Sequence, residues 1–135
     1  MKKITSLVLV VVLALSVFAL TGCPSNEVDI NAKSEGVMTW AQYNAAELDT
    51  EVVVEVYVQA TQGWFVNKDG KEVISVYAAD GDGGYFLYEM ACSEENAKKL
   101  VPGTKIKVTG YKGAWSEEVE IMEGTFEFCN DGITY

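Results

Sequence analysis

Apolar and polar residues alternate along five segments of the chain, and this period of two residues predicts β-strands. The clearest case is the segment 50–61 (TEVVVEVYVQAT), in which every second residue from Val52 to Val58 is valine while the positions between are mixed. A strand with one apolar and one mixed face is half-buried in a sheet. The other segments with strand patterns are 72–79, 85–92, 104–111 and 117–128, the last with an expected bend near Gly124.

The same alternation assigns a face to each side chain of the second and third strands. Placing Ile74, Val76 and Ala78 toward the interior leaves Tyr77 outward. In the third strand we expect Phe86, Tyr88 and Met90 in the core and Tyr85 outside, and in the fourth we expect Lys105 and Lys107 on the outer face. In the first strand, Tyr57 is expected outside.

Two short helices interrupt the strands. Thr39 is a suitable N-cap for a helix over 40–48, and Ser93 is a suitable N-cap for one over 93–100. The second helix carries acidic residues in its first turn and lysines in its last, and the Pro102-Gly103 pair ends it. A glycine-rich turn follows Asp80. The resulting order, three strands, a helix and two strands, predicts a mainly β protein with a small closed barrel.

The N-terminus has the layout of a secretory signal peptide. Lys2 and Lys3 precede an uncharged stretch over 4–20, and the sequence Leu20-Thr21-Gly22-Cys23 closes it. A transmembrane helix is the alternative, because the apolar stretch is nearly long enough to span a bilayer.

Those four closing residues resemble the lipobox of bacterial lipoproteins. The resemblance implies cleavage before Cys23, attachment of diacylglycerol to its thiol, and an extracytoplasmic protein anchored in the cell membrane by its acyl chains. Two chains suffice for stable anchoring. The expected organisation is a signal peptide over 1–22, a flexible tether over 23–37, a barrel domain over 38–129, and a tail or the start of a further segment over 130–135.

The order of elements is also the one found in the OB-fold, a five-stranded barrel with a helix between its third and fourth strands. The segments 38–43 (MTWAQY), 85–90 (YFLYEM) and 103–120 resemble OB-like surface lipoproteins of Gram-positive bacteria. This resemblance covers roughly 37–128 and implies a fold and a location. It implies no reaction.

Composition excludes several kinds of chemistry. The formal net charge is −10 and the chain has no histidine; every basic side chain is a lysine. Histidine bases, histidine-ligated metals and arginine clamps are therefore absent, and the acidity opposes nucleic-acid binding. We expect no catalytic residue, no metal site and no cofactor. Asp80-Gly81-Asp82 is read as a turn, because the remaining ligands of a calcium loop do not follow.

Cys92 and Cys129 end the third and fifth strands, which are neighbours in an OB barrel. We therefore expect Cys92 and Cys129 to lie near one another, with a disulfide possible between them and two free thiols as the alternative.

Aromatic residues are the candidates for ligand binding. OB barrels bind ligands across their second and third strands, between the loops that join strands one to two and four to five. Trp64 and Phe65 are expected in the first of these loops and Trp115 in the second, with Tyr77 and Tyr85 between them. The alternative is that both tryptophans fold back to close the ends of the barrel.

The expected function is non-catalytic binding of a saccharide or cell-wall glycan by these aromatic faces. The alternative is a structural or interaction domain that contacts another envelope protein and holds no small ligand. Single-stranded nucleic acid, a common OB ligand, conflicts with the acidity.

Overall fold

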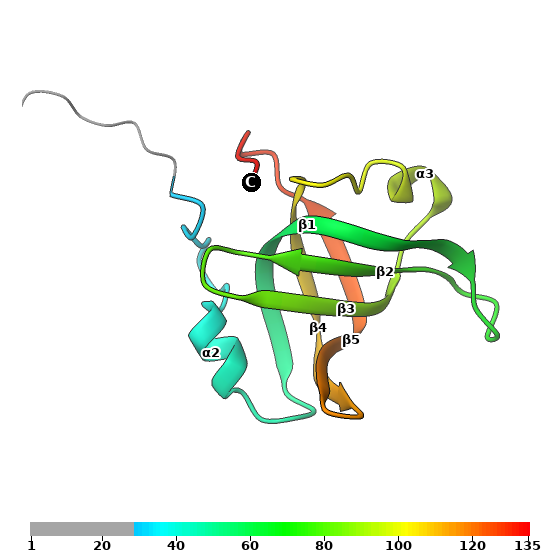
Figure 1. Cartoon of the computed structure of the whole chain (residues 1–135), viewed down its shortest axis with the longest axis horizontal. Coiled ribbons are helices and arrows are strands. Elements are labelled where there is room, and N and C mark those ends of the chain that lie inside the picture. The colour runs from blue at the N-terminus through cyan, green and yellow to red at the C-terminus, as the bar shows by residue number, and fades with distance from the viewer. Residues whose placement is uncertain (1–28) are drawn as a thin grey trace, which may run out of the picture.

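The computed structural model describes residues 29–135, so the predicted signal peptide and Cys23 lie outside the described part. This part is mainly β, with five strands and two short helices (Figure 1). The elements are α2 (Trp40–Ala45), β1 (Glu51–Val66), β2 (Glu72–Ala79), β3 (Gly84–Ala91), α3 (Glu94–Ala97), β4 (Lys105–Trp115) and β5 (Glu118–Phe128). None of the described helices is long and apolar enough to span a membrane.

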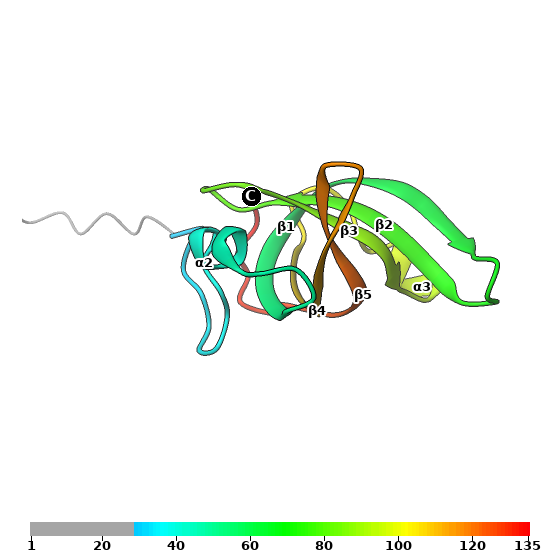
Figure 2. The same ribbon diagram turned by 90° about the horizontal axis from the view of Figure 1, so that it is seen from below.

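The strands form a closed barrel in the order β1-β2-β3-β5-β4. Neighbouring strands are antiparallel except β3 and β5, which run parallel where Leu87 lies opposite Ile121. The long strand β1 pairs with β4 in its first half and with β2 in its second, which is how it closes the barrel (Figures 1 and 2). The predicted five-stranded OB-like barrel, with a helix between β3 and β4 and a short N-terminal helix, is confirmed.

The alternating valines of β1 line the interior, as the sequence predicts. Val52, Val54, Val56 and Val58 are fully buried, and they pack with apolar residues of the other four strands. Burying a valine in this way contributes roughly 1.5–3 kcal/mol. The core therefore depends on the two-residue period that identified the strand.

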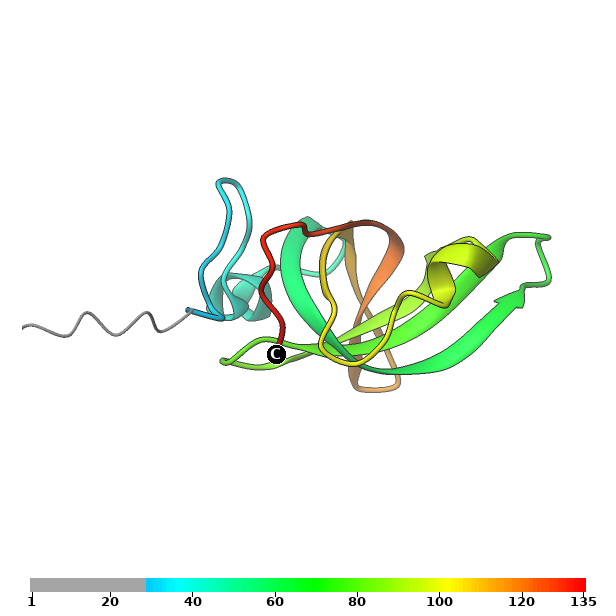
Figure 3. The ribbon, with the colours of Figure 1, turned by 90° about the horizontal axis from the view of Figure 1, so that it is seen from above.

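The outer face of β1 is also covered. Tyr57, predicted outward, is 0% exposed, because its hydroxyl donates to the carbonyl of Ile30 (3.2 Å) and its ring meets that of Tyr135 edge-on at 5.6 Å. The N-terminal segment and the C-terminal tail thus both cross the barrel beside β1 (Figure 3). The two-residue period of β1 gives no indication that other segments of the chain cover its outer face.

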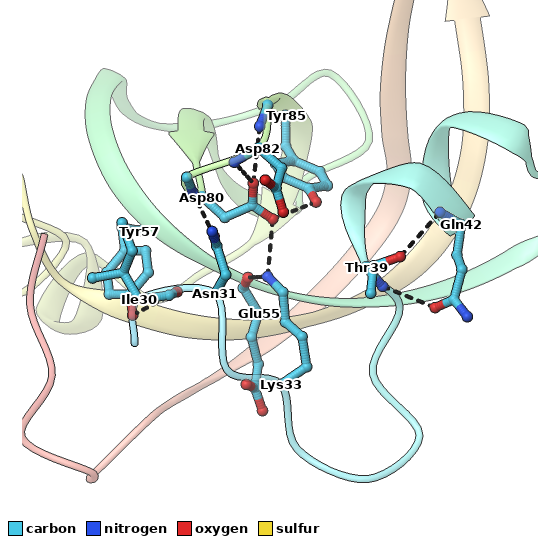
Figure 4. A network of polar contacts seen from close by, with 12 residues as sticks. Ile30, Asn31, Lys33, Thr39, Gln42, Glu55, Tyr57, Asp80, Asp82 and Tyr85 are labelled. Atoms are coloured by element: carbon cyan, nitrogen blue, oxygen red, sulfur yellow. Dashed lines mark hydrogen bonds and ion pairs between the residues drawn. The ribbon is translucent and has the colours of Figure 1, made fainter. Parts of the chain in front are cut away.

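The N-terminal segment is held by polar contacts, so the prediction of a flexible tether is wrong for residues 30–37. Lys33 Nζ forms an ion pair with Asp80 (2.9 Å) and donates to the Glu55 carbonyl (2.8 Å) (Figure 4). Asn31 Oδ1 accepts from the Gly81 amide. Both Lys33 and Asp80 side chains are nearly inaccessible, at 10% and 0% exposed. A partly buried pair of this kind fixes the segment on the barrel.

The C-terminal tail is held by a second buried lysine. Lys105 Nζ lies 2.5 Å from Asp131 and 3.8 Å from Glu55. Its side chain is 5% exposed, so its place on the outer face of β4 does not leave it solvated as predicted. The hydrogen bond from Lys105 lowers the pKa of Asp131.

The helix α2 begins where predicted and ends sooner. Thr39 and Gln42 form a capping box at its start. It ends at Ala45 instead of residue 48, with Ala46 already extended. Lys112 of β4, 6% exposed, donates to the carbonyls of Tyr43 (3.0 Å), Asn44 (2.8 Å) and Ala46 (2.7 Å). These carbonyls lie at the helix end, where among the three only that of Tyr43 also accepts from a backbone amide, that of Ala46 (3.2 Å), so Lys112 acts as a C-cap.

Candidate functional site: an aromatic groove

The outer face of the β2–β3 hairpin carries stacked aromatic rings. Tyr77 is 41% exposed, as predicted, and lies opposite Phe86 across the two strands. Their ring centroids are 4.8 Å apart and the planes are inclined by 25°. Gln62 of β1 donates to the Tyr77 hydroxyl at 2.8 Å and thereby fixes the tyrosine ring. The result is a flat, partly exposed aromatic surface.

The faces of β3 are the reverse of those predicted around its first residues. Tyr85 is 4% exposed and lies in the core, where its ring is 5.0 Å from that of Tyr43, while Phe86 and Tyr88 point outward. The register explains this result, since Tyr85 pairs with the inward-facing Ala78. Tyr85 is therefore not part of a ligand surface.

Met90 nevertheless faces inward, as predicted. In a regular strand, Tyr85 and Met90 would lie on opposite faces, because they are separated by an odd number of positions. Both face inward because β3 has a bulge at Glu89, whose φ is +42°, opposite a register shift between Ile74 and Val76 in β2. The Glu89 amide donates to the Ser75 hydroxyl at 3.0 Å at this point. A bulge inserts one residue and so changes which face the following residues occupy.

Trp115 stands at the end of the β4–β5 hairpin. The turn residues Ser116 and Glu117 both have positive φ, +47° and +74°, as in the type I′ turns that join closely paired strands. Trp115 pairs with Glu118 across the hairpin and is 76% exposed. The tryptophan is therefore presented to solvent and does not close the barrel end.

These elements enclose a groove of about 480 Å³. It lies over β2, β3 and the β4–β5 hairpin, on the surface by which OB barrels bind ligands. Residues of β5 at every second position contribute to it, because they share one face of that strand. The residues that line the groove are Gln62, Tyr77, Phe86, Tyr88, Trp115, Glu118, Glu120 and Met122.

The groove is acidic. Glu120 is 5% exposed, and burial together with the charge of Glu118 raises its pKa. Among the described residues that line the groove there is no lysine. Positive charge would therefore be favoured here, and negative charge opposed.

A second hollow of about 490 Å³ continues from the groove, with which it shares Tyr88 and Met122. Its lining is more polar and includes Asn67, Lys71 and Glu89. Glu89 accepts hydrogen bonds from Asn67 Nδ2 and from the Tyr88 hydroxyl, both at 3.1 Å. The two hollows together form an elongated surface with an aromatic and a polar part.

Trp64 lies elsewhere, and the prediction that both tryptophans flank one groove is wrong. Its indole N–H donates to the Cys92 carbonyl at 3.0 Å, and it lines a separate hollow of about 300 Å³ beside α3. Phe65 is 42% exposed and lines none of these three hollows. The reason is that β1 stays paired with β2 as far as Val66, so Trp64 and Phe65 belong to a strand instead of a loop.

Phe86, Tyr88 and Gln62 were missed by the sequence interpretation. A signal for Phe86 exists in the turn. With Asp80 to Gly83 as the turn, Ala79 pairs with Gly84 and Tyr77 with Phe86. Residues directly opposite each other on paired strands share a face. Fixing this register first would have placed Phe86 beside Tyr77.

The cysteines and the acidic turn do not form sites. Cys92 and Cys129 have free thiols, so the disulfide considered possible is not formed in this structure. The Cys92 thiol donates to the Ser93 carbonyl, and the backbone amide of Cys129 donates to the Lys105 carbonyl. Asp80 is part of a turn, as expected. Within residues 29–135, no three histidine, cysteine, aspartate or glutamate side chains are placed to hold a metal ion.

The fold and the groove together define an OB-like barrel with an aromatic, acidic surface on its β2–β3 face. Comparison of the chain with protein-family models and with curated proteins finds no match.

Proposed function

We propose that this protein is a lipid-anchored, extracytoplasmic binding module that holds a saccharide in the aromatic groove and carries out no reaction. The observation that carries the proposal is the exposure of Trp115 beside the Tyr77–Phe86 stack on one groove wall. Solvent-exposed aromatic side chains gathered on one surface are typical of an interaction site.

The chemistry of the groove suits a sugar ring. The faces of pyranose rings carry C–H groups that pack on flat aromatic rings, and their hydroxyls need hydrogen-bond partners. Glu118 and Glu120 supply acceptors, and the amide of Gln62 supplies both donor and acceptor groups. Recognition by a mostly apolar surface with a few placed polar groups is the general pattern of small-ligand sites.

The polar hollow beyond Tyr88 favours a ligand longer than one sugar. An oligosaccharide could extend from the aromatic part over Tyr88 and Met122 toward Asn67 and Lys71, which line the polar hollow and not the groove. A cell-wall glycan has the required length. The proposal includes no cofactor.

The anchoring part of the proposal depends on Cys23 and the sequence before it. Mass spectrometry of the protein extracted from membranes is expected to find a diacylglyceryl group on an N-terminal Cys23. An unmodified protein with the segment 1–22 still attached would contradict it.

A second candidate function is supported by the β4–β5 hairpin. Tyr111, Val119 and Met122 are 42%, 43% and 38% exposed, and with Trp115 they leave apolar side chains accessible along the hairpin. Such a surface suits a protein partner in the cell envelope. This candidate predicts binding of a protein and no affinity for glycans.

The test is binding of a panel of oligosaccharides to the purified protein by calorimetry. Trp115→Ala is expected to weaken binding about 30-fold, the effect of losing roughly 2 kcal/mol at a tryptophan that contacts the ligand. Phe65→Ala is the matched control, because Phe65 is an exposed aromatic residue outside the groove. Equal affinity of wild type and Trp115→Ala for every bound glycan would exclude the groove as the site.

A further inference from the structure

A carboxylate without a partner in residues 29–135 faces the groove. Glu120 is 5% exposed and lines the groove, yet its side chain forms no hydrogen bond and no ion pair with any residue in 29–135. Its cross-strand neighbour is Gly113, which offers no side chain. The adjacent buried lysine, Lys112, directs its Nζ to the carbonyls of α2. The carboxylate oxygens of Glu120 are accessible from the groove, because within residues 29–135 the Tyr43 hydroxyl is the one side-chain polar atom that is fully buried without a partner. A carboxylate placed in this way can accept hydrogen bonds from a ligand in the groove.

The surroundings of Glu120 favour a cation. Glu118 lies two residues away on the same face of β5, and burial of Glu120 together with the charge of Glu118 raises the pKa of Glu120. Burial and the charge of Glu120 raise the pKa of the Tyr43 phenol to about 12. An ammonium group in the groove would neutralise this field and would also be attracted by the faces of Trp115 and Tyr77.

We propose that the groove selects saccharides that carry a free amino group, with the sugar ring on the aromatic surface and its ammonium group at Glu120. This inference rests on the proposed function, which it narrows from glycans in general to N-deacetylated amino sugars. Acetylation of the amino group removes the charge and adds bulk, so the acetylated form loses the contact. Negatively charged glycans are disfavoured by Glu118 and Glu120 together.

The experiment compares three tetrasaccharides of similar length: the β-1,4-linked oligomers of glucosamine, of N-acetylglucosamine and of glucose. Calorimetry is carried out at about 0.15 M salt, where the Debye length is about 8 Å and distant surface charges are screened. Wild type is expected to bind the glucosamine oligomer about 10- to 100-fold more tightly than the other two, the effect of one charge-assisted hydrogen bond. Glu120→Gln is expected to remove this preference.

Two controls separate a specific contact from general attraction to an acidic protein. Glu127→Gln removes an exposed charge from the same strand outside the groove and is expected to keep the preference. Choline tests recognition of a cation without a sugar, and it is expected to bind much more weakly than the oligomer.

Several outcomes would overturn the inference. Equal binding of the glucosamine and N-acetylglucosamine oligomers would refute the inference and leave the proposed function standing. Absence of binding to all three, together with no hit in the wider panel, would refute both. A preference for the amino form that Glu120→Gln and Glu127→Gln lower equally would show attraction to the surface alone. Tight binding of choline would show that the site recognises cations and not sugars.

Discussion

The substitution Lys112→Met tests the side chain that joins α2 to the barrel. The ammonium of Lys112 is buried and donates three hydrogen bonds to backbone carbonyls at the end of α2, at distances of 2.7–3.0 Å. It also lies 5.3 Å from the centre of the Tyr43 ring. Methionine has a similar length and preserves most of the packing but none of these interactions.

The expected loss of stability is about 3 kcal/mol. Hydrogen bonds to a charged donor contribute roughly 1.5–3 kcal/mol each, and there are three of them. The cost of removing the ammonium from water, several kcal/mol, offsets part of this gain. The helix end is partly accessible, with Asn44 exposed, so water can replace some of the lost partners.

Urea denaturation followed by circular dichroism measures this loss as a lower midpoint with an unchanged slope. Lys107→Met is the control, because Lys107 lies on the same strand, is only half-buried and forms no hydrogen bond or ion pair within residues 29–135. We expect that variant to lie within about 0.5 kcal/mol of wild type. A loss below about 1 kcal/mol for Lys112→Met would refute the conclusion that Lys112 fixes α2 to the barrel.

Two further predictions concern the turn between β2 and β3. Burial alone would raise the pKa of Asp80, but the hydrogen bond from Lys33 and other donors lower it below the usual 3.8; its stabilising contribution is therefore present above that value and is lost as the pH falls through the folded-state pKa. We expect Asp80→Asn to show a flatter decline of unfolding free energy than wild type between about pH 5 and pH 2, and identical acid profiles would contradict this. Gly83→Ala places a Cβ 1.9 Å from the Trp40 indole nitrogen and should cost about 1–3 kcal/mol, whereas Gly84→Ala, whose nearest neighbour is 3.9 Å away, should cost clearly less in the same urea measurement.

The strands and their order could be predicted from the sequence because the signals are local. The period of two residues in β1 reflects burial of Val52 to Val58, and the turn residues between strands have intrinsic backbone preferences. The capping box at Thr39 is equally local. The OB-like fold follows from the order of these elements.

Contacts between segments distant in the chain could not be predicted. Lys33, Lys105 and Lys112 all look like solvent-exposed lysines in the sequence. In the structure Lys105 and Lys112 are buried and Lys33 is half-buried, each with partners at least 22 residues away. Such pairs depend on how the N-terminal segment, the tail and α2 cover the barrel. The assignment of Trp64 and Phe65 to a loop failed for a related reason, since pairing with β2 extends β1 beyond its alternating pattern.

The groove depends on the register of β3 more than on any residue type. In the segment 85–88 (YFLY), aromatic or aliphatic side chains occupy both faces, so hydrophobic patterning leaves two possible orientations of the strand. The turn decides between them. Asp80 accepts hydrogen bonds from two turn amides and from the Tyr85 hydroxyl, and it pairs with Lys33, which holds Tyr85 inside. Phe86 and Tyr88 must then point outward, beside Tyr77. The buried carboxylate of Asp80, which the sequence places in a turn, therefore acts as the residue that orients the aromatic wall of the groove.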